Sequence, residues 1–324
     1  MDEVDAIAEL IINYNELNSS VVTELDEEPS PLEFMRFVAK NTPFVVRGAA
    51  SDWKASQTWS AQSLKEHLAD ETVNVAVTPA GNADSPSQNS DGTLVFAKPW
   101  EEDQPFPSFL DYVIQQEKQP NIPPGEVRYA QTQNDNLRHE YSSLFAHVPP
   151  TIPFARIALQ SPPDAINLWI GNSLSTTALH KDNYENIYVQ ILGRKHFVLL
   201  PPHCQPAVNE RMLKPVRYVR AEEGSELRMG GEEDGGDVPF AIWDPDRPGE
   251  NRTQYSGMVE PARVTLERGD MLYLPAMWYH KVSQSCSEEG ICVAVNYWYD
   301  MDFSGPLYPL TNFVRSVNAS RNKD

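Results

Sequence analysis

Hydrophobic residues recur at helical spacing near the start of the chain, at Ile7, Leu10, Ile11 and Tyr14. This spacing predicts an amphipathic helix. Residues 30–33 (SPLE) combine a capping serine, proline at the first helical position and glutamate three residues after the serine, which predicts a second helix over 32–39. Residues 44–47 (FVVR) predict a strand, and Ser60 is predicted to cap a helix that continues through Leu68.

Strands and helices are predicted to alternate between about residues 70 and 160. Apolar and polar positions alternate over 73–77, and a short apolar run follows at 94–97, so each predicts a strand. Residues 128–131 (RYAQ) are also expected to form a strand. A helix is predicted over 108–116. Residues 81–91 are rich in Ser, Asn, Asp and Gly, which favours a loop.

The part of the chain from about 164 to 300 is dominated by strand patterns. Residues 187–192 and 195–200 are β-branched and aromatic runs around the turn Gly193-Arg194, which predicts a hairpin. Four more strands are predicted at 262–266, 271–274, 280–284 and 291–299, and a short helix at 306–318. The acidic, glycine-rich stretch 220–237 is predicted to be a mobile excursion.

Many short strands separated by Gly and Pro turns indicate a mainly β fold with flanking helices, as a sandwich or barrel. We predict a double-stranded β-helix, the jelly roll of cupins, because it brings strands that are distant in sequence to one open end. The expected organisation is a helical and strand region over 1–160 that extends the barrel, the barrel core over 161–304, and a C-terminal helix and tail over 305–324.

Composition narrows the class of protein. The chain has 324 residues, is 40% hydrophobic and carries a net charge of -20, so we expect it to repel nucleic acid and anionic membranes and to attract a basic protein segment. No apolar run approaches the ~20 residues that a membrane helix needs. Three cysteines and an acidic start without a signal-peptide pattern predict a soluble intracellular protein, cytoplasmic or nuclear.

The candidate chemistry lies in two separated segments, His180-Lys-Asp182 and a distant histidine, His280. Two imidazoles and one carboxylate form the facial triad that holds Fe(II) and leaves positions open for a co-substrate and O2. Lys195 lies in a strand pattern between the two segments, where it could anchor an acidic co-substrate. The sequence therefore predicts a non-haem iron site.

These residues lie in segments that resemble one enzyme family. The segments are AVTPAGNAD (76–84), DAINLWIG (164–171), LHKDNYENIY (179–188), GRKHF (193–197), LPP (200–202), GDMLYLPAMWYH (269–280) and AVNYWYD (294–300). Together they resemble JmjC-domain 2-oxoglutarate oxygenases, and in particular the small lysyl hydroxylases that consist of a JmjC domain alone. The resemblance covers most of the chain from about residue 30 onward.

The resemblance implies a role for each candidate residue. His180, Asp182 and His280 would bind Fe(II), and Lys195 would pair with the distal carboxylate of 2-oxoglutarate. The residues expected to contact this co-substrate with Lys195 are Thr177, Tyr188, Tyr129, Asn186 and Asn296. Tyr184 and Glu185 follow the metal pair and are expected at the pocket mouth, where an acidic residue would suit a substrate lysine.

The resemblance also implies a reaction, the C3 hydroxylation of a lysine in a developmentally regulated GTP-binding protein, with O2 as the second co-substrate. Three alternatives stay open: demethylation of N-methyl-lysine or arginine, peptidase action on histone tails, and a non-catalytic cupin-like binding protein. A homodimer is expected through an apolar stripe on the C-terminal helix, formed by Leu307, Leu310, Phe313 and Val314.

Overall fold

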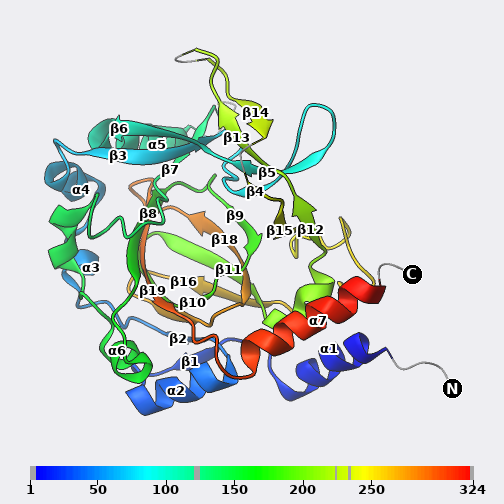
Figure 1. The fold of residues 1–324 in the computed structure, drawn as a ribbon. Coiled ribbons are helices and arrows are strands. Elements are labelled where there is room, and N and C mark those ends of the chain that lie inside the picture. Colours follow the sequence, from blue (N-terminus) through cyan, green and yellow to red (C-terminus); the bar gives the residue numbers. More distant parts are fainter. Residues whose placement is uncertain (1–4, 120–124, 223–224, 233–234, 322–324) are drawn as a thin grey trace.

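Two facing β-sheets form the centre of the molecule (Figure 1). The computed structural model describes residues 5–119, 125–222, 225–232 and 235–321. The larger sheet has the order β1 (Thr23–Leu25), β2 (Phe44–Val46), β17 (Met271–Leu274), β10 (Tyr184–Leu192), β19 (Cys292–Asp300) and β8 (Ala165–Gly171). The smaller sheet has the order β16 (Ala262–Leu266), β11 (Arg194–Leu200), β18 (Tyr279–Ser285) and β9 (Thr177–His180).

Strands that follow one another in the chain alternate between these two sheets. β8, β10, β17 and β19 lie in the larger sheet, whereas β9, β11, β16 and β18 lie in the smaller one. This alternation is the double-stranded β-helix that the strand-rich pattern and the split ligand set predicted. The side chains between the sheets form one apolar cluster, which includes Tyr188, Phe197, Leu272 and Val282.

The hairpin predicted around Gly193 is wrong. β10 pairs with β17 and β19, while β11 pairs with β16 and β18, so the two strands lie in different sheets. At Gly193 the chain crosses from one sheet to the other with a φ of 70°. An alternating apolar pattern identifies a strand but not its partners, and both strands already have a neighbour on each side.

A helical layer packs on the outer face of the larger sheet and on a small neighbouring sheet. It consists of α2 (Pro31–Lys40), α3 (Lys54–Thr58), α4 (Ala61–His67), α5 (Phe106–Lys118), the 3-10 helix η1 (Ser142–His147) and α6 (Pro153–Leu159). The capping box at Ser30 is confirmed, because the Ser30 hydroxyl accepts from Glu33 N and the Glu33 carboxylate accepts from Ser30 N. Buried residues of these helices pack in one cluster with Ile187 and Val295 of the sheet. Strands of the larger sheet are therefore buried on both faces.

Three small sheets extend the barrel. They are β6 (Trp100–Pro105), β3 (Thr72–Thr78) and β7 (Val127–Tyr129); β14 (Arg228–Glu232), β13 (Pro215–Val219), β5 (Leu94–Lys98) and β4 (Ser85–Gln88); and β12 (Glu210–Leu213) with β15 (Val238–Ala241). Two predictions are corrected here. The predicted loop 81–91 contains β4, and the excursion 220–237 contains β14, since pairing with β5 and β13 outweighs their low strand propensity.

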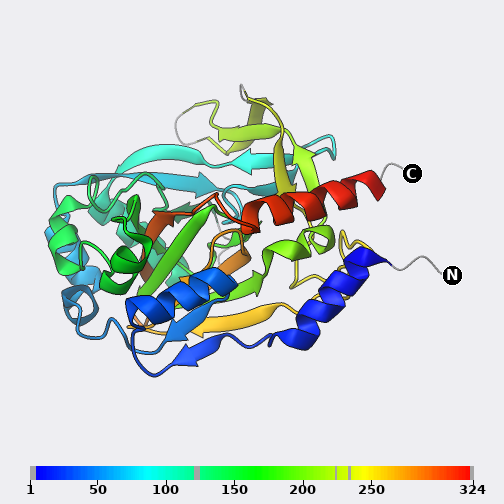
Figure 2. The ribbon, with the colours of Figure 1, turned by 60° about the horizontal axis from the view of Figure 1, so that its bottom comes forward.

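The opposite side of the barrel carries α1 (Ala6–Leu17), the 3-10 helix η2 (Pro202–Ala207) and α7 (Leu307–Arg321). Both α1 and α7 pack against η2, and an ion pair joins Arg321 to Asp5, the N-cap residue of α1 (Figure 2). The two terminal helices are thus held together on one side of the molecule.

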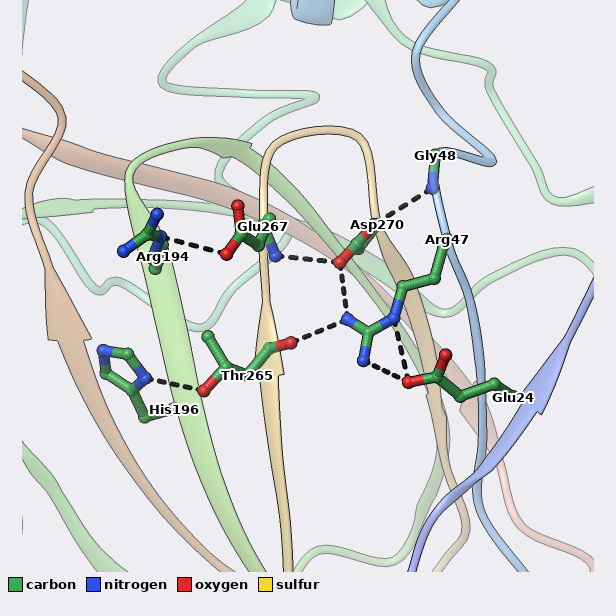
Figure 3. A network of polar contacts seen from close by, with 8 residues as sticks. All are labelled: Glu24, Arg47, Gly48, Arg194, His196, Thr265, Glu267 and Asp270. Carbon is green, nitrogen blue, oxygen red and sulfur yellow. Dashed lines mark hydrogen bonds and ion pairs between the residues drawn. The ribbon is translucent and has the colours of Figure 1, made fainter.

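A polar network fixes the edge at which the two sheets meet (Figure 3). Asp270 accepts hydrogen bonds from Gly48 N at 3.0 Å, Glu267 N at 2.9 Å and the Arg47 guanidinium at 2.7 Å. Arg47 also donates to Thr265 O at 2.7 Å and pairs with Glu24. The network therefore ties β1 and β2 to the connection between β16 and β17.

Candidate metal and co-substrate site

The three predicted metal ligands converge at one end of the barrel. Ligand atoms of His180, Asp182 and His280 all lie within 4.8 Å of one another, and no other such group of His, Cys, Asp or Glu occurs in the described residues. Asp182 Oδ2 is 3.6 Å from Nε2 of each histidine. Two imidazole nitrogens and one carboxylate oxygen are a donor set that suits Fe(II) and leaves about half of an octahedral shell open.

A bulge at the edge of the smaller sheet brings the two histidines together. His180 is paired with His280, and Thr177 with Val282, so the two residues between these pairs on β9 oppose the single Lys281 of β18. A strand turns successive side chains to opposite faces, and one extra residue restores Thr177 to the same face as His180. Asp182 follows β9 in a loop, and its backbone carbonyl accepts a hydrogen bond from Met277 N at 2.7 Å. The bulge thus places Thr177 beside the metal ligands.

Backbone carbonyls orient both histidines. Nδ1 of His180 lies 2.8 Å from Ala178 O, and Nδ1 of His280 lies 3.0 Å from Trp278 O. Each Nδ1 therefore carries the proton, and each Nε2 presents its lone pair to the centre. Burial lowers the pKa of His280 to about 4, which keeps this imidazole neutral at neutral pH.

Asp182 is ionised in this setting. Burial alone would raise its pKa, but the two histidines outweigh burial and lower the pKa to about 2. For His180, burial is outweighed by Asp182 and by the hydrogen bond to Ala178, so its pKa is raised. The Asp182 carboxylate therefore supplies a negative charge for a cation.

An inner chamber lies between the two sheets next to the ligands. It is lined by Tyr129, Gln133, Trp169, Thr177, Asn186, Tyr188, Lys195, Phe197, Leu274, Val282, Asn296 and Trp298, together with His180, Asp182 and His280. The structure therefore brings all six residues predicted to contact the co-substrate into one cavity. The roles assigned to them stay predictions.

Lys195 gives the inner chamber its charge. Its side chain is buried, and Nζ donates to the Tyr129 hydroxyl at 2.7 Å, while no carboxylate among the described residues pairs with it. Burial lowers the pKa of Lys195 to about 8. A buried cation without a counter-charge is costly, so an anionic ligand fits this chamber.

An amide pair forms one wall of the chamber. Asn296 Nδ2 donates to Asn186 Oδ1 at 3.1 Å, and Asn296 Oδ1 accepts from Trp169 Nε1 at 2.8 Å. Asn296 therefore orients Asn186, whose own amide nitrogen has no partner among the described residues. The pairing of β10 with β19 places the two asparagines on the barrel face of the sheet.

The structure contradicts the expected position of Glu185. Its side chain is buried, and its carboxylate accepts from the Tyr273 hydroxyl at 2.6 Å and Ala276 N at 3.1 Å. Asn186 and Tyr188 face the barrel, so strand alternation turns Glu185 to the other face, away from the mouth. Tyr184 lies two residues before Asn186 and therefore on the same face of the strand. Its ring stacks on that of Trp298, which lines the chamber, and the ring centroids are 4.7 Å apart.

An outer groove continues from the inner chamber to the surface. Gln133, Trp169, Thr177, His180 and Asp182 line both cavities, so the metal site lies where they meet. Residues that line only the groove include Asp84, Glu101, Gln131, Lys181, Glu210, Phe240 and Arg315. The sequence assigned none of these a role. Asp84 lies in one of the segments that carry the resemblance, whereas Glu210 and Arg315 had no sequence signal.

Comparisons with known proteins agree on one family. Residues 29–305 match the model of the Cupin-like domain. The human bifunctional peptidase and (3S)-lysyl hydroxylase JMJD7 is 37% identical over 87% of this chain and 85% of its own length. The lysine-specific demethylase JMJ32 of Arabidopsis thaliana is 35% identical over 91% of this chain and 86% of its own. The JmjC domain-containing protein E of Dictyostelium discoideum is 31% identical over 90% of this chain and 87% of its own length.

The family match spans the strands that carry the ligands and the inner chamber, and the relatives are matched over most of their length. The fold, the ligand set and these similarities agree: the chain belongs to the cupin-like family of JmjC-domain proteins.

Proposed function

We propose that this chain is an Fe(II)- and 2-oxoglutarate-dependent oxygenase that hydroxylates C3 of a lysine in a protein substrate. The observation that carries the proposal is the buried, uncompensated Lys195 in a chamber that ends at three convergent metal ligands. A dicarboxylate would satisfy both features, with one carboxylate paired to Lys195 and the other bound to the metal. The human relative named as a (3S)-lysyl hydroxylase supports the substrate class.

Each residue has a defined task in this reaction. His180, Asp182 and His280 would hold Fe(II), which together with 2-oxoglutarate supplies the activation of O2 for C–H hydroxylation. Lys195 would bind the distal carboxylate, with hydroxyl hydrogen bonds from Thr177 and Tyr188. The other expected contacts of the co-substrate are Tyr129, Asn186 and Asn296. The apolar walls of the inner chamber exclude water, which strengthens the ion pair with Lys195.

The test uses mass spectrometry of lysine-containing peptides incubated with the protein, Fe(II), 2-oxoglutarate and O2. The expected product is a peptide that has gained one oxygen on lysine, only when 2-oxoglutarate is present. His180→Ala and Asp182→Ala should abolish the product, because each removes a ligand. His139→Ala, at an exposed histidine outside the site, is the matched control. Full activity in either ligand variant would refute the metal assignment.

A demethylase is the second candidate, because a relative is named a lysine-specific demethylase. The same ligands and chamber would serve this reaction, with an N-methyl group at the metal. If a methylated peptide loses a methyl group in the same assay, the reaction of this chain is demethylation and not hydroxylation. The human relative is also named a peptidase, and truncated peptides would identify that activity.

We further propose a developmentally regulated GTP-binding protein as the substrate, on the basis of the sequence resemblance alone. A protein partner fits the activity for which the human relative is named. No described helix is long and apolar enough to cross a membrane. All three cysteines are unpaired, which supports the proposed cytoplasmic or nuclear location. Full-length candidate proteins, tested beside their isolated lysine peptides, would identify the substrate.

A further inference from the structure

The two cavities that meet at the metal site differ in the charge they offer a ligand. The inner chamber presents Lys195 and therefore suits an anion. The outer groove carries more carboxylates than cations, with Asp84, Glu101, Asp182 and Glu210 against Lys181 and Arg315. A side chain that enters the groove therefore meets more carboxylates than cations, which favours a cation if one of the carboxylates is left without a cationic partner.

Three of these four carboxylates already have a function or a partner. Glu210 lies 3.7 Å from Lys181 Nζ and accepts from Arg315 Nε at 3.0 Å. Glu101 accepts from Arg217 at 2.8 Å, and Asp182 is a metal ligand. None of the three is therefore left to bind a further cation.

Asp84 is the exception. Its carboxylate accepts one hydrogen bond, from Gln131 Nε2 at 3.0 Å, and it forms no ion pair with any residue in the described ranges. Burial raises the pKa of Asp84, and neither the hydrogen bond from Gln131 nor the charges of His180 and Lys98 offset that effect. A partly desolvated carboxylate with a single amide donor gains most from a cationic ligand.

The backbone fixes Asp84 relative to the metal ligands. Thr176 N donates to Gly81 O at 2.8 Å, and a Cβ on Gly81 would lie 2.1 Å from Leu174 O. The loop that leads to Asp84 is thus pressed against the residues before β9, the strand that ends at His180. Asp84 itself has a φ of 52°, a left-handed conformation that the docked loop maintains.

We propose that Asp84 recognises the ε-ammonium group of an unmethylated substrate lysine and so places C3 of that lysine at the metal. This inference rests on the proposed hydroxylase function. A primary ammonium donates up to three hydrogen bonds, whereas a trimethylammonium donates none. Nζ lies four bonds from C3, about 5 Å in an extended side chain, so an ammonium held by Asp84 keeps its own substituents away from the metal. Asp84 would thereby select hydroxylation over demethylation.

The experiment measures binding without turnover. The protein is loaded with paramagnetic Mn(II) and 2-oxoglutarate, and the proton relaxation of the peptide acetyl-Gly-Lys-Gly-amide is recorded. A second peptide carries norleucine, which has the carbon chain of lysine without the amine. With the natural protein, the C3 protons of lysine should relax faster than the methylene protons next to the amine, and norleucine should bind about tenfold more weakly.

The variant Asp84→Asn keeps the shape of the side chain and removes its charge. It should bind the lysine peptide about tenfold more weakly and lose the preference over norleucine. Asp91→Asn is the control with the same change of charge, because the exposed Asp91 contacts Thr93 in a nearby turn and does not line the groove. The control should bind both peptides like the natural protein.

Three results would overturn the proposal: no binding of the lysine peptide to the natural protein, unchanged discrimination in Asp84→Asn, or faster relaxation at the amine end than at C3. Expected relaxation without any oxygenated product would leave Asp84 as the cation-binding residue and reject the hydroxylase reaction. Oxygenated product with unchanged discrimination in Asp84→Asn would support the hydroxylase reaction and reject Asp84 as the cation-binding residue. The two assignments therefore fail separately.

Discussion

We expect Lys195 to make the binding of 2-oxoglutarate dependent on pH. In the ligand-free protein, burial lowers its pKa to about 8, and only the charged lysine pairs with a carboxylate. Affinity should therefore be constant below about pH 8 and fall above it, approaching tenfold per pH unit. Calorimetric titration of the Mn(II)-loaded protein with 2-oxoglutarate, from about pH 6.5 to 9.5, measures this slope. Unchanged affinity at the upper end would show that Lys195 does not bind the co-substrate.

The same residue is expected to reduce the stability of the ligand-free protein. Lys195→Met removes a buried charge and keeps the length of the side chain, so the free energy of unfolding near neutral pH should rise by about 1–3 kcal/mol. Binding of 2-oxoglutarate should be lost. Denaturant unfolding and calorimetry of one preparation test both effects, and lower stability of the variant would contradict the first.

Glu185 should matter for stability and not for substrate binding. Glu185→Ala leaves the Tyr273 hydroxyl and Ala276 N without their acceptor in the core, which costs about 2–4 kcal/mol in the free energy of unfolding. The KM for a peptide substrate should not change, because the side chain faces away from the groove. A raised KM at unchanged stability would return Glu185 to the pocket mouth. Glu16→Ala, at an exposed position on α1, is the control.

At the scale of elements, the crossing between the two sheets depends on Gly193. A Cβ there would lie 2.5 Å from Ser285 O, and the φ of 70° is unfavourable for any other residue. Gly193→Ala should lower the free energy of unfolding by about 2–4 kcal/mol. Gly231→Ala, where a Cβ meets no atom within 4 Å, should change it by less than about 0.5 kcal/mol. Equal unfolding midpoints for the two variants would contradict this account.

The sequence predicted most elements and the chemistry of the site, but not the pairings that build it. The capping box at Ser30 and six of the eight barrel strands, β10, β11 and β16 to β19, followed from local patterns, because capping and alternation are local. The hairpin at Gly193 and the position of Glu185 failed for another reason: strands buried on both faces show no polar side that marks their partners or orientation. The bulge in β9 also left no local pattern, since it depends on the register with β18.

At the scale of the whole molecule, the expected homodimer stays a prediction. The predicted stripe on α7 is divided: Leu307 packs near Met277, whereas Leu310 is 59% and Phe313 64% exposed. Phe313→Glu should weaken a dimer at least about tenfold, which light scattering after size-exclusion chromatography would detect. Leu17→Glu, at an exposed apolar residue of α1, should have no effect. A natural protein that is monomeric at all concentrations would end the proposal.

The pairing of His180 with His280 also bears on how the protein is made. About 100 residues of chain separate the two ligands, and they meet only when the second barrel strand pairs with the seventh. A nascent chain that has not yet released β18 from the ribosome lacks the third ligand, although His180 and Asp182 have already emerged. The proposed tight binding of iron therefore has to wait until β18 has emerged and paired with β9, and metal uptake would report that pairing.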